Sequence, residues 1–129
     1  MGGAVRVAIP RMGEHVAPCL EHCATMAIFT IEAGEVADQF DFPLRSQDPF
    51  DRVRLLRDQR VHTIICGGIQ GVYEDALRAS GLQVISWVSG TVDDLLDLYL
   101  RGRLVAEAGA SGRGRSESPA RGEERGKPG

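Results

Sequence analysis

The stretch that decides the fold is "VHTIICGGIQGVYEDALRASGLQVISWV", residues 61–88. Its first six residues, 61–66, are nearly all apolar, a pattern typical of a short strand buried on both faces. After a Gly-Gly pair, apolar residues recur at helical spacing until Gly81, and residues 82–88 again have the pattern of a strand. Strand, helix and strand in this order predict a β-α-β unit with parallel strands and a right-handed crossover.

The residues before this unit predict a strand and a hairpin. Residues 4–10, "AVRVAIP", place Val5, Val7 and Ile9 on one face and indicate a strand that we expect to end at its proline. Residues 25–32 are rich in β-branched and aromatic side chains, and residues 35–42 alternate in polarity. The intervening Ala33 and Gly34 favour a tight turn, so these two runs are predicted to pair as a β-hairpin.

Two further helices are indicated by their first residues. Asp48 is a candidate N-cap followed by proline at the first helical position, which predicts a helix over residues 48–60. Thr91 with Asp94 three residues later has capping-box spacing and predicts a helix over residues 91–102. The helix positions expected to face the core are Phe50, Val53, Leu55 and Leu56, then Ile69, Val72, Tyr73, Ala76 and Leu77, then Val92, Leu95, Leu96 and Tyr99.

The order β-β-β-α-β-α-β-α predicts an α/β fold: a five-stranded mixed sheet with helices on both faces. If the first strand is central, with the hairpin on one side, the strand order reverses between residues 4–10 and 61–66. Ligands of such sheets bind beyond the carboxyl ends of the strands at this reversal. The loops there, residues 11–23 and 66–71, would bring all three cysteines to one end of the sheet.

Composition bounds the class of protein. The 129 residues carry 15 Lys and Arg against 18 Asp and Glu, and the basic excess lies only in residues 108–129. We therefore expect one domain, residues 1–107, and a disordered Gly/Arg/Glu/Ser-rich tail without large apolar residues. Nucleic acid is disfavoured as a partner of an acidic domain, because its binding requires clustered Lys and Arg that neutralise phosphates. An odd cysteine count, no signal-peptide pattern and no long apolar run predict a cytoplasmic protein with free thiols and no membrane partner.

Soft side chains cluster in "HVAPCLEHCAT", residues 15–25, which contains Cys19, His22 and Cys23. Cys66 follows the buried strand on the facing loop. Thiolate and imidazole are the ligands of metal–sulfur clusters, so these four residues are the candidate metal ligands. Buried cysteines often only pack, and C-x-x-H-C is not a usual zinc spacing, so a core role and a zinc site both stay open.

Other residues near the same loops have two interpretations. Gly67 and Gly68 would let the backbone approach a bulky cofactor closely, and Arg11 could neutralise an anionic one or simply lie at the surface. His15 could join the ligand shell, although an exposed loop histidine fits its position as well. His62 begins a buried strand at the opposite end and is discounted.

Three stretches together resemble a known family. They are "VRVAIP" leading into "VAPCLEHCATMAIFTIEAGEV", then "VHTIICGGIQGVYEDALRASGLQVISWVSG", then "TVDDLLDLYLRGRL", covering roughly residues 4–105. In order and spacing they resemble the dinitrogenase iron–molybdenum cofactor biosynthesis family, which includes NifX- and NafY-like cluster carriers and the NifB C-terminal domain. The chain departs from that pattern at Leu20 and Glu21, and Cys19 stands near a position that is His in many relatives.

The resemblance implies a ribonuclease-H-like fold and a function. The implied protein is a non-catalytic carrier, as a monomer or weak dimer, that takes an iron–sulfur or molybdenum–iron–sulfur cluster from a donor protein and passes it to an acceptor. The alternatives are a cluster-free regulatory or protein-interaction module, with no cofactor, and a structural zinc-binding module. Nuclease chemistry is disfavoured because residues 4–10 contain no metal-binding carboxylate. A Cys–His nucleophile would lack a group to orient the histidine.

Overall fold

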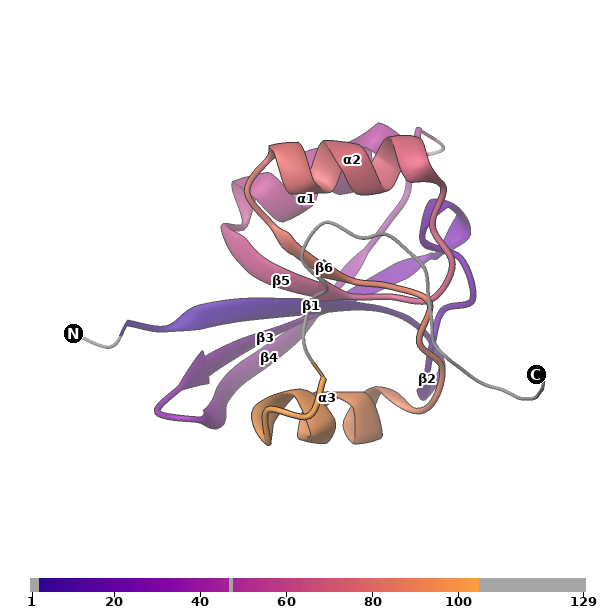
Figure 1. Ribbon diagram of the computed structural model, residues 1–129. Helices are drawn as coiled ribbons and strands as arrows, with labels where there is room; N and C mark the ends of the chain where they lie inside the picture. The colour runs from indigo at the N-terminus through magenta and orange to yellow at the C-terminus, as the bar shows by residue number, and fades with distance from the viewer. Residues whose placement is uncertain (1–2, 47, 105–129) are drawn as a thin grey trace.

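The computed structural model describes residues 3–46 and 48–104, and the predicted tail at residues 108–129 lies outside them. One mixed sheet is covered by three α-helices (Figure 1). The elements in chain order are β1 (Val5–Met12), β2 (His15–Val16), the 3-10 turn η1 (Leu20–His22), β3 (Thr25–Glu32), β4 (Glu35–Pro43), α1 (Pro49–Asp58), β5 (Val61–Ile65), α2 (Gly71–Ala79), β6 (Gln83–Ile85) and α3 (Val92–Leu100).

The strands lie in the order β4-β3-β1-β5-β6. β1 pairs antiparallel with β3, and β3 antiparallel with β4, whereas β1 pairs parallel with β5 and β5 with β6. The hairpin turn has left-handed φ values of 54° at Ala33 and 79° at Gly34, which suits the twist of paired strands. The predicted central first strand, the hairpin and the reversal of strand order between β1 and β5 are therefore confirmed.

The predicted number of strands is wrong, because the sheet has six. The additional strand, β2, lies in the expected loop and pairs antiparallel with the end of β1. β1 itself runs to Met12 and does not end at Pro10. Its parallel pairing with β5 extends only to Ala8, so beyond that point β1 has no β5 partner, and a proline is tolerated at such a strand edge. The Pro10 carbonyl instead accepts a hydrogen bond from Ala17 N at 2.8 Å.

The last strand is shorter than the sequence pattern indicated. We expected residues 82–88 to be extended, but β6 ends at Ile85. Trp87 has a φ of 64°, in the left-handed region that a bulky side chain rarely adopts, and this backbone conformation cannot continue a strand. The chain therefore turns away from the sheet at the carboxyl end of β6.

The sheet separates two apolar clusters, one on each face. α1 and α2 cover one face and α3 covers the other, as Figure 1 shows. The buried residues under α1 and α2 include Leu20, Cys23, Met26, Ile28, Val53, Leu56, Ile64, Cys66, Ile69 and Leu77. Those under α3 include Val7, Ile9, Ala27, Phe29, Ile65, Ile85, Val92, Leu95 and Leu96.

The helix starts agree with the sequence prediction. The Asp48 side chain accepts a hydrogen bond from Phe50 N at 3.0 Å, and the Thr91 hydroxyl accepts one from Asp94 N at 3.1 Å. Each side chain satisfies a backbone N–H group that has no partner within its helix. None of the helices in the described ranges is long and apolar enough to cross a membrane.

Two positions of the predicted apolar helix faces are wrong. Phe50 is 39% exposed and Val72 is 54% exposed, whereas Arg52, a polar position in the pattern, is only 5% exposed. The guanidinium of Arg52 donates hydrogen bonds to the carbonyls of Cys23 at 2.7 Å and Ser46 at 3.3 Å. Both acceptors lie outside α1, and Cys23 is 29 residues away in sequence, so helical periodicity alone could not indicate the burial of this arginine.

Candidate functional site

A groove of about 350 Å³ lies beyond the carboxyl ends of the parallel strands, where the strand order reverses. We call it the switch-point groove. This is the place where open α/β sheets bind ligands, and the volume is at the lower end of the range for small-molecule sites. The residues that line it are His15, Val16, Pro18, Gly67, Gly68, Trp87, Val88, Ser89 and Gly90.

Backbone pairing joins the two loops that the sequence placed at this point. Cys19 and Gly68 form an isolated parallel bridge. Gly68 N donates to the Pro18 carbonyl at 2.7 Å, and Leu20 N donates to the Gly68 carbonyl at 2.9 Å. The loop after β1 and the loop after β5 therefore form one wall of the groove, as the predicted topology required.

Gly67 and Gly68 line the groove, and the neighbouring loops pack closely against both of them. A Cβ atom at Gly67 would lie 2.7 Å from the Ala17 carbonyl oxygen, closer than real Cβ contacts allow. A Cβ atom at Gly68 would lie 3.0 Å from the Pro18 carbonyl oxygen and 3.3 Å from the six-membered ring of Trp87. Side chains at these positions would thus push the neighbouring loops out of place.

Trp87 is a lining residue that the sequence analysis did not single out. Its side chain is 70% exposed, and its φ of 64° is unfavourable for a bulky residue. Two backbone hydrogen bonds hold this conformation: Trp87 N donates to the Gly67 carbonyl at 2.8 Å, and Val88 N donates to the Cys66 carbonyl at 3.2 Å. The sequence contained no signal for this strain, because it arises from contacts between two separate loops.

Cys19, one of the predicted ligands, is half-buried and its thiol is already paired. Its Sγ donates a hydrogen bond to Glu21 Oε1 at 2.8 Å, and Gln70 N donates to Glu21 Oε2 at 2.5 Å. Partial burial and the bond to Glu21 raise the pKa of the Cys19 thiol. Burial alone would raise the pKa of Glu21, but the hydrogen bonds from Cys19 and Gln70 N lower it overall. Glu21 was missed as a partner because only the fold brings Gln70 to it.

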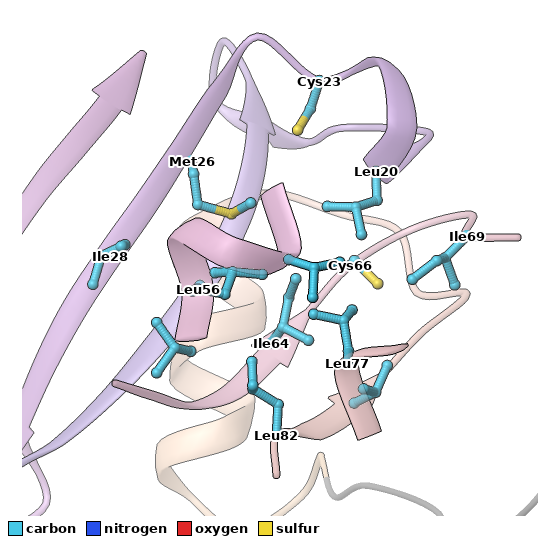
Figure 2. Close-up of a cluster of buried hydrophobic side chains, with 14 of the residues drawn as sticks. Leu20, Cys23, Met26, Ile28, Leu56, Ile64, Cys66, Ile69, Leu77 and Leu82 are labelled. Carbon is cyan, nitrogen blue, oxygen red and sulfur yellow. The ribbon is translucent and has the colours of Figure 1, made fainter. Parts of the chain in front are cut away.

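Cys66 and Cys23 are buried in the core under α1 and α2. Cys66 is fully inaccessible, and Figure 2 shows it among Leu20, Ile69 and Leu77. Its burial strongly raises the pKa of the thiol. Cys23 is 4% exposed, and burial also raises the pKa of its thiol although the Arg52 guanidinium opposes that rise. Both thiols are therefore protonated packing groups in this conformation.

The remaining predicted site residues are spread over the surface. His22 is exposed at the end of η1. Arg11 donates to the Gly13 carbonyl at 2.8 Å and pairs with Asp41 of β4 at 3.6 Å, so its guanidinium extends away from β5. In the parts of the chain that the structure describes, no three His, Cys, Asp or Glu side chains form a group that could hold a metal ion. The ligand roles of Cys19, His22, Cys23 and Cys66 stay predictions.

Solved structures share this fold. PH0822 superposes with a TM-score of 0.73 at 18% identity, covering 81% of this chain and 96% of its own. The apo form of the orange protein from Desulfovibrio gigas has a TM-score of 0.69 at 19% identity, covering 84% of this chain and 98% of its own. TM1290 from Thermotoga, assigned to the DUF35 family, has a TM-score of 0.60 at 25% identity, covering 79% of this chain and 92% of its own.

Sequence comparison identifies the family directly. A search of curated proteins finds no significant match. The family profile described as "Dinitrogenase iron-molybdenum cofactor" matches residues 3–102, which include every strand and helix of the fold. The mixed six-stranded α/β architecture is the one that the structural neighbours share. The chain therefore belongs to the dinitrogenase iron–molybdenum cofactor family.

Proposed function

We propose that this protein is a non-catalytic carrier that holds an iron–sulfur or molybdenum–iron–sulfur cluster in transit between a donor and an acceptor protein in the cytoplasm. The observation that carries the proposal is the switch-point groove, at the ligand position of an open α/β sheet in a chain of this family. We extend the proposal to a ribonuclease-H-like assignment of the fold and to a monomer or weak dimer as the working state.

The lining of the groove supports binding more than catalysis. His15 is the one acid–base side chain among the lining residues, and the lining contains no Asp, Glu, Lys or Arg. The lining offers His15 and the Ser89 hydroxyl, but it contains no third acid–base side chain that could orient the imidazole. A nucleophile with an activating base and an orienting group is what covalent catalysis needs.

Among the predicted thiol ligands, Cys19 is the best placed to meet a cluster. It is half-buried, and its backbone pairs with Gly68, which lines the groove. To act as a ligand its thiol must lose its proton and leave Glu21, because the thiolate is the form that binds metal. Cys23 and Cys66 would become ligands only after the core under α1 and α2 opened, since both are buried.

Anaerobic reconstitution tests the carrier function. The full chain is incubated with iron, sulfide and molybdate, desalted, and analysed for visible absorption and for metal and sulfide content. We expect a chromophore with bound iron and sulfide, weakened in Cys19→Ser and retained in a folded Cys66→Ser variant. The carrier proposal fails if wild-type protein forms no chromophore and all three cysteine variants leave the metal content unchanged.

The same measurement separates the alternatives. One zinc ion per chain without sulfide would indicate the structural zinc-binding module instead. A folded protein that retains no metal under any condition would indicate a cluster-free regulatory or interaction module. The buried positions of Cys23 and Cys66 are the observation that favours this last alternative.

A further inference from the structure

We infer that the cargo lies against the indole ring of Trp87 and is bound by the imidazole of His15, inside the switch-point groove. This inference rests on the proposed carrier function and adds two residues to it that the predicted set of ligands lacked or left open. It is carried by the groove, the conformation of Trp87 and the position of His15.

Trp87 combines an exposed aromatic ring with an energetically unfavourable backbone conformation, as expected of a residue kept for ligand binding. Most large apolar side chains of this chain are buried, yet this ring is 70% exposed and lines a groove. Its left-handed backbone is unfavourable for a bulky residue, and such strain concentrates at ligand-binding positions. A residue without a side chain would adopt this φ freely, so the folding of the chain does not call for tryptophan at position 87.

Gly68 fixes the position of that ring. The Cβ of any other residue at position 68 would lie 3.3 Å from the ring carbon Cζ3 of Trp87 and 3.5 Å from Cη2. The ring therefore lies directly over the backbone at the start of the β5–α2 loop. Gly68 N donates a hydrogen bond to the Pro18 carbonyl, so the ring packs against backbone at which the loop after β5 is paired with the loop after β1.

His15 supplies the one metal-ligating side chain of the lining. It is exposed, but its backbone belongs to β2 and is not a free loop. The residue pairs with Met12 of β1 and forms a second, isolated bridge with Thr91 at the start of α3. The neighbouring Val16 N donates to the Gly90 carbonyl at 3.0 Å. Neutral imidazole is a common metal ligand, and the backbone that carries this one is held by β1 on one side and by Thr91, the N-cap of α3, on the other.

The chemistry of the lining fits a soft, polarisable ligand. Apart from His15 and the Ser89 hydroxyl, the groove presents apolar side chains and glycine backbone, with no formal charge from Lys, Arg, Asp or Glu. The sulfide surface of a cluster is polarisable, and polarisable sulfur packs favourably against aromatic rings such as that of Trp87.

Tryptophan fluorescence tests the inference directly, because Trp87 is the single tryptophan of the chain. The full-length protein is titrated anaerobically with tetrathiomolybdate as a molybdenum–sulfur probe, and bound molybdenum is measured after desalting. We expect saturable quenching of Trp87 emission in wild type. His15→Asn should weaken retention at least about tenfold, since even the groups that only support a ligand contribute 10–100-fold to metal affinity.

Two further variants complete the test. Trp87→Gly relieves the unfavourable φ, so it should unfold at no lower denaturant concentration than wild type while retaining less molybdenum. His62→Asn is the matched control: this histidine is exposed at the start of β5, far along the strand from the groove, and should bind like wild type. Retention unchanged in both His15→Asn and Trp87→Gly, with wild-type binding intact, overturns the inference and leaves the carrier function standing. Wild-type protein that binds neither the probe nor a reconstituted cluster instead overturns the carrier function itself.

Discussion

The thiol of Cys19 and the carboxylate of Glu21 form a hydrogen bond, with Sγ and Oε1 2.8 Å apart. The second carboxylate oxygen accepts from Gln70 N, the N-cap residue of α2. A side chain that is only 5% exposed thus connects the turn η1 to the start of a helix on the neighbouring loop. The hydrogen bonds from the Cys19 thiol and from Gln70 N lower the pKa of this carboxyl despite its burial, and negative charge is favourable at a helix N-terminus.

Replacing Glu21 should therefore destabilise the fold. Glu21→Gln keeps the shape but removes the charge, and we expect the free energy of unfolding at neutral pH to fall by about 1–3 kcal/mol. Urea unfolding followed by circular dichroism measures the change. Glu14→Gln, an exposed glutamate on the loop between β1 and β2, is the control and should match wild type. Equal midpoints for both variants would show that the contact with Gln70 contributes no stability.

Because of the same carboxylate, we expect the free energy of unfolding to fall at acidic pH. The pKa of Glu21 is lowered in the folded protein from its ordinary value of 4.5, so the unfolded chain binds the proton more readily. The stabilisation is present above about pH 4.5 and is lost as the pH falls through the lower, folded pKa. Wild type and Glu21→Gln should accordingly converge in stability on acidification. Parallel curves down to about pH 3 would contradict this assignment.

Because of Cys66, we expect the free energy of unfolding to fall at alkaline pH as well. Its burial raises the pKa of the folded thiol above the ordinary value of 9.0, so the unfolded chain ionises first. Stability is then complete below about pH 9 and declines as the pH rises above it. Unfolding free energies measured at about pH 8 and about pH 10 should differ less in Cys66→Ala than in wild type. The variant itself should lose about 1–2 kcal/mol at neutral pH because it leaves a small cavity.

Gly67 offers a test of the loop packing that forms the groove wall. Gly67→Ala would bring a Cβ atom within 2.7 Å of the Ala17 carbonyl oxygen, and backbone would have to move. We expect a loss of about 1–3 kcal/mol in thermal or urea unfolding. Gly71→Ala is the matched control, because a Cβ atom there meets nothing within 4 Å and alanine favours the helix. A neutral Gly67→Ala variant would indicate that the wall is not rigid.

Arg52 should hold α1 against the loop before β3 and the loop after β4. Its guanidinium donates to the carbonyls of Cys23 and Ser46, and its Nε has no hydrogen-bond partner within the described residues. Arg52→Ala should lower the free energy of unfolding by about 2–4 kcal/mol, since the buried Cys23 carbonyl and the partly buried Ser46 carbonyl lose their donor and a cavity opens. Arg54→Ala, on the exposed side of the same helix, should change it by less than about 1 kcal/mol. Similar losses for the two variants would contradict this role of Arg52.

Local patterns were enough for the three helices and for every strand except β2. β3 runs over the predicted residues 25–32, and the helix caps Asp48 and Thr91 are those that the side chains indicated. These features depend on neighbours within four residues, whose preferences are written in the chain itself. The errors fall where distant contacts decide: the guanidinium of Arg52, for example, is buried where it donates to the carbonyl of Cys23, 29 residues away.

The sequence by itself determined the α/β class, the parallel unit around residues 61–88 and the end of the sheet at which the cysteines gather. Only the tertiary structure decided which side chains line the groove there. Burial placed Cys23 and Cys66 in the core, and pairing across the switch point assembled a groove from His15 and Trp87. The physical reason is that the direction of a loop side chain is set by the backbone hydrogen bonds and close contacts of segments remote in sequence, here those between Pro18 and Gly68 and between Gly67 and Trp87.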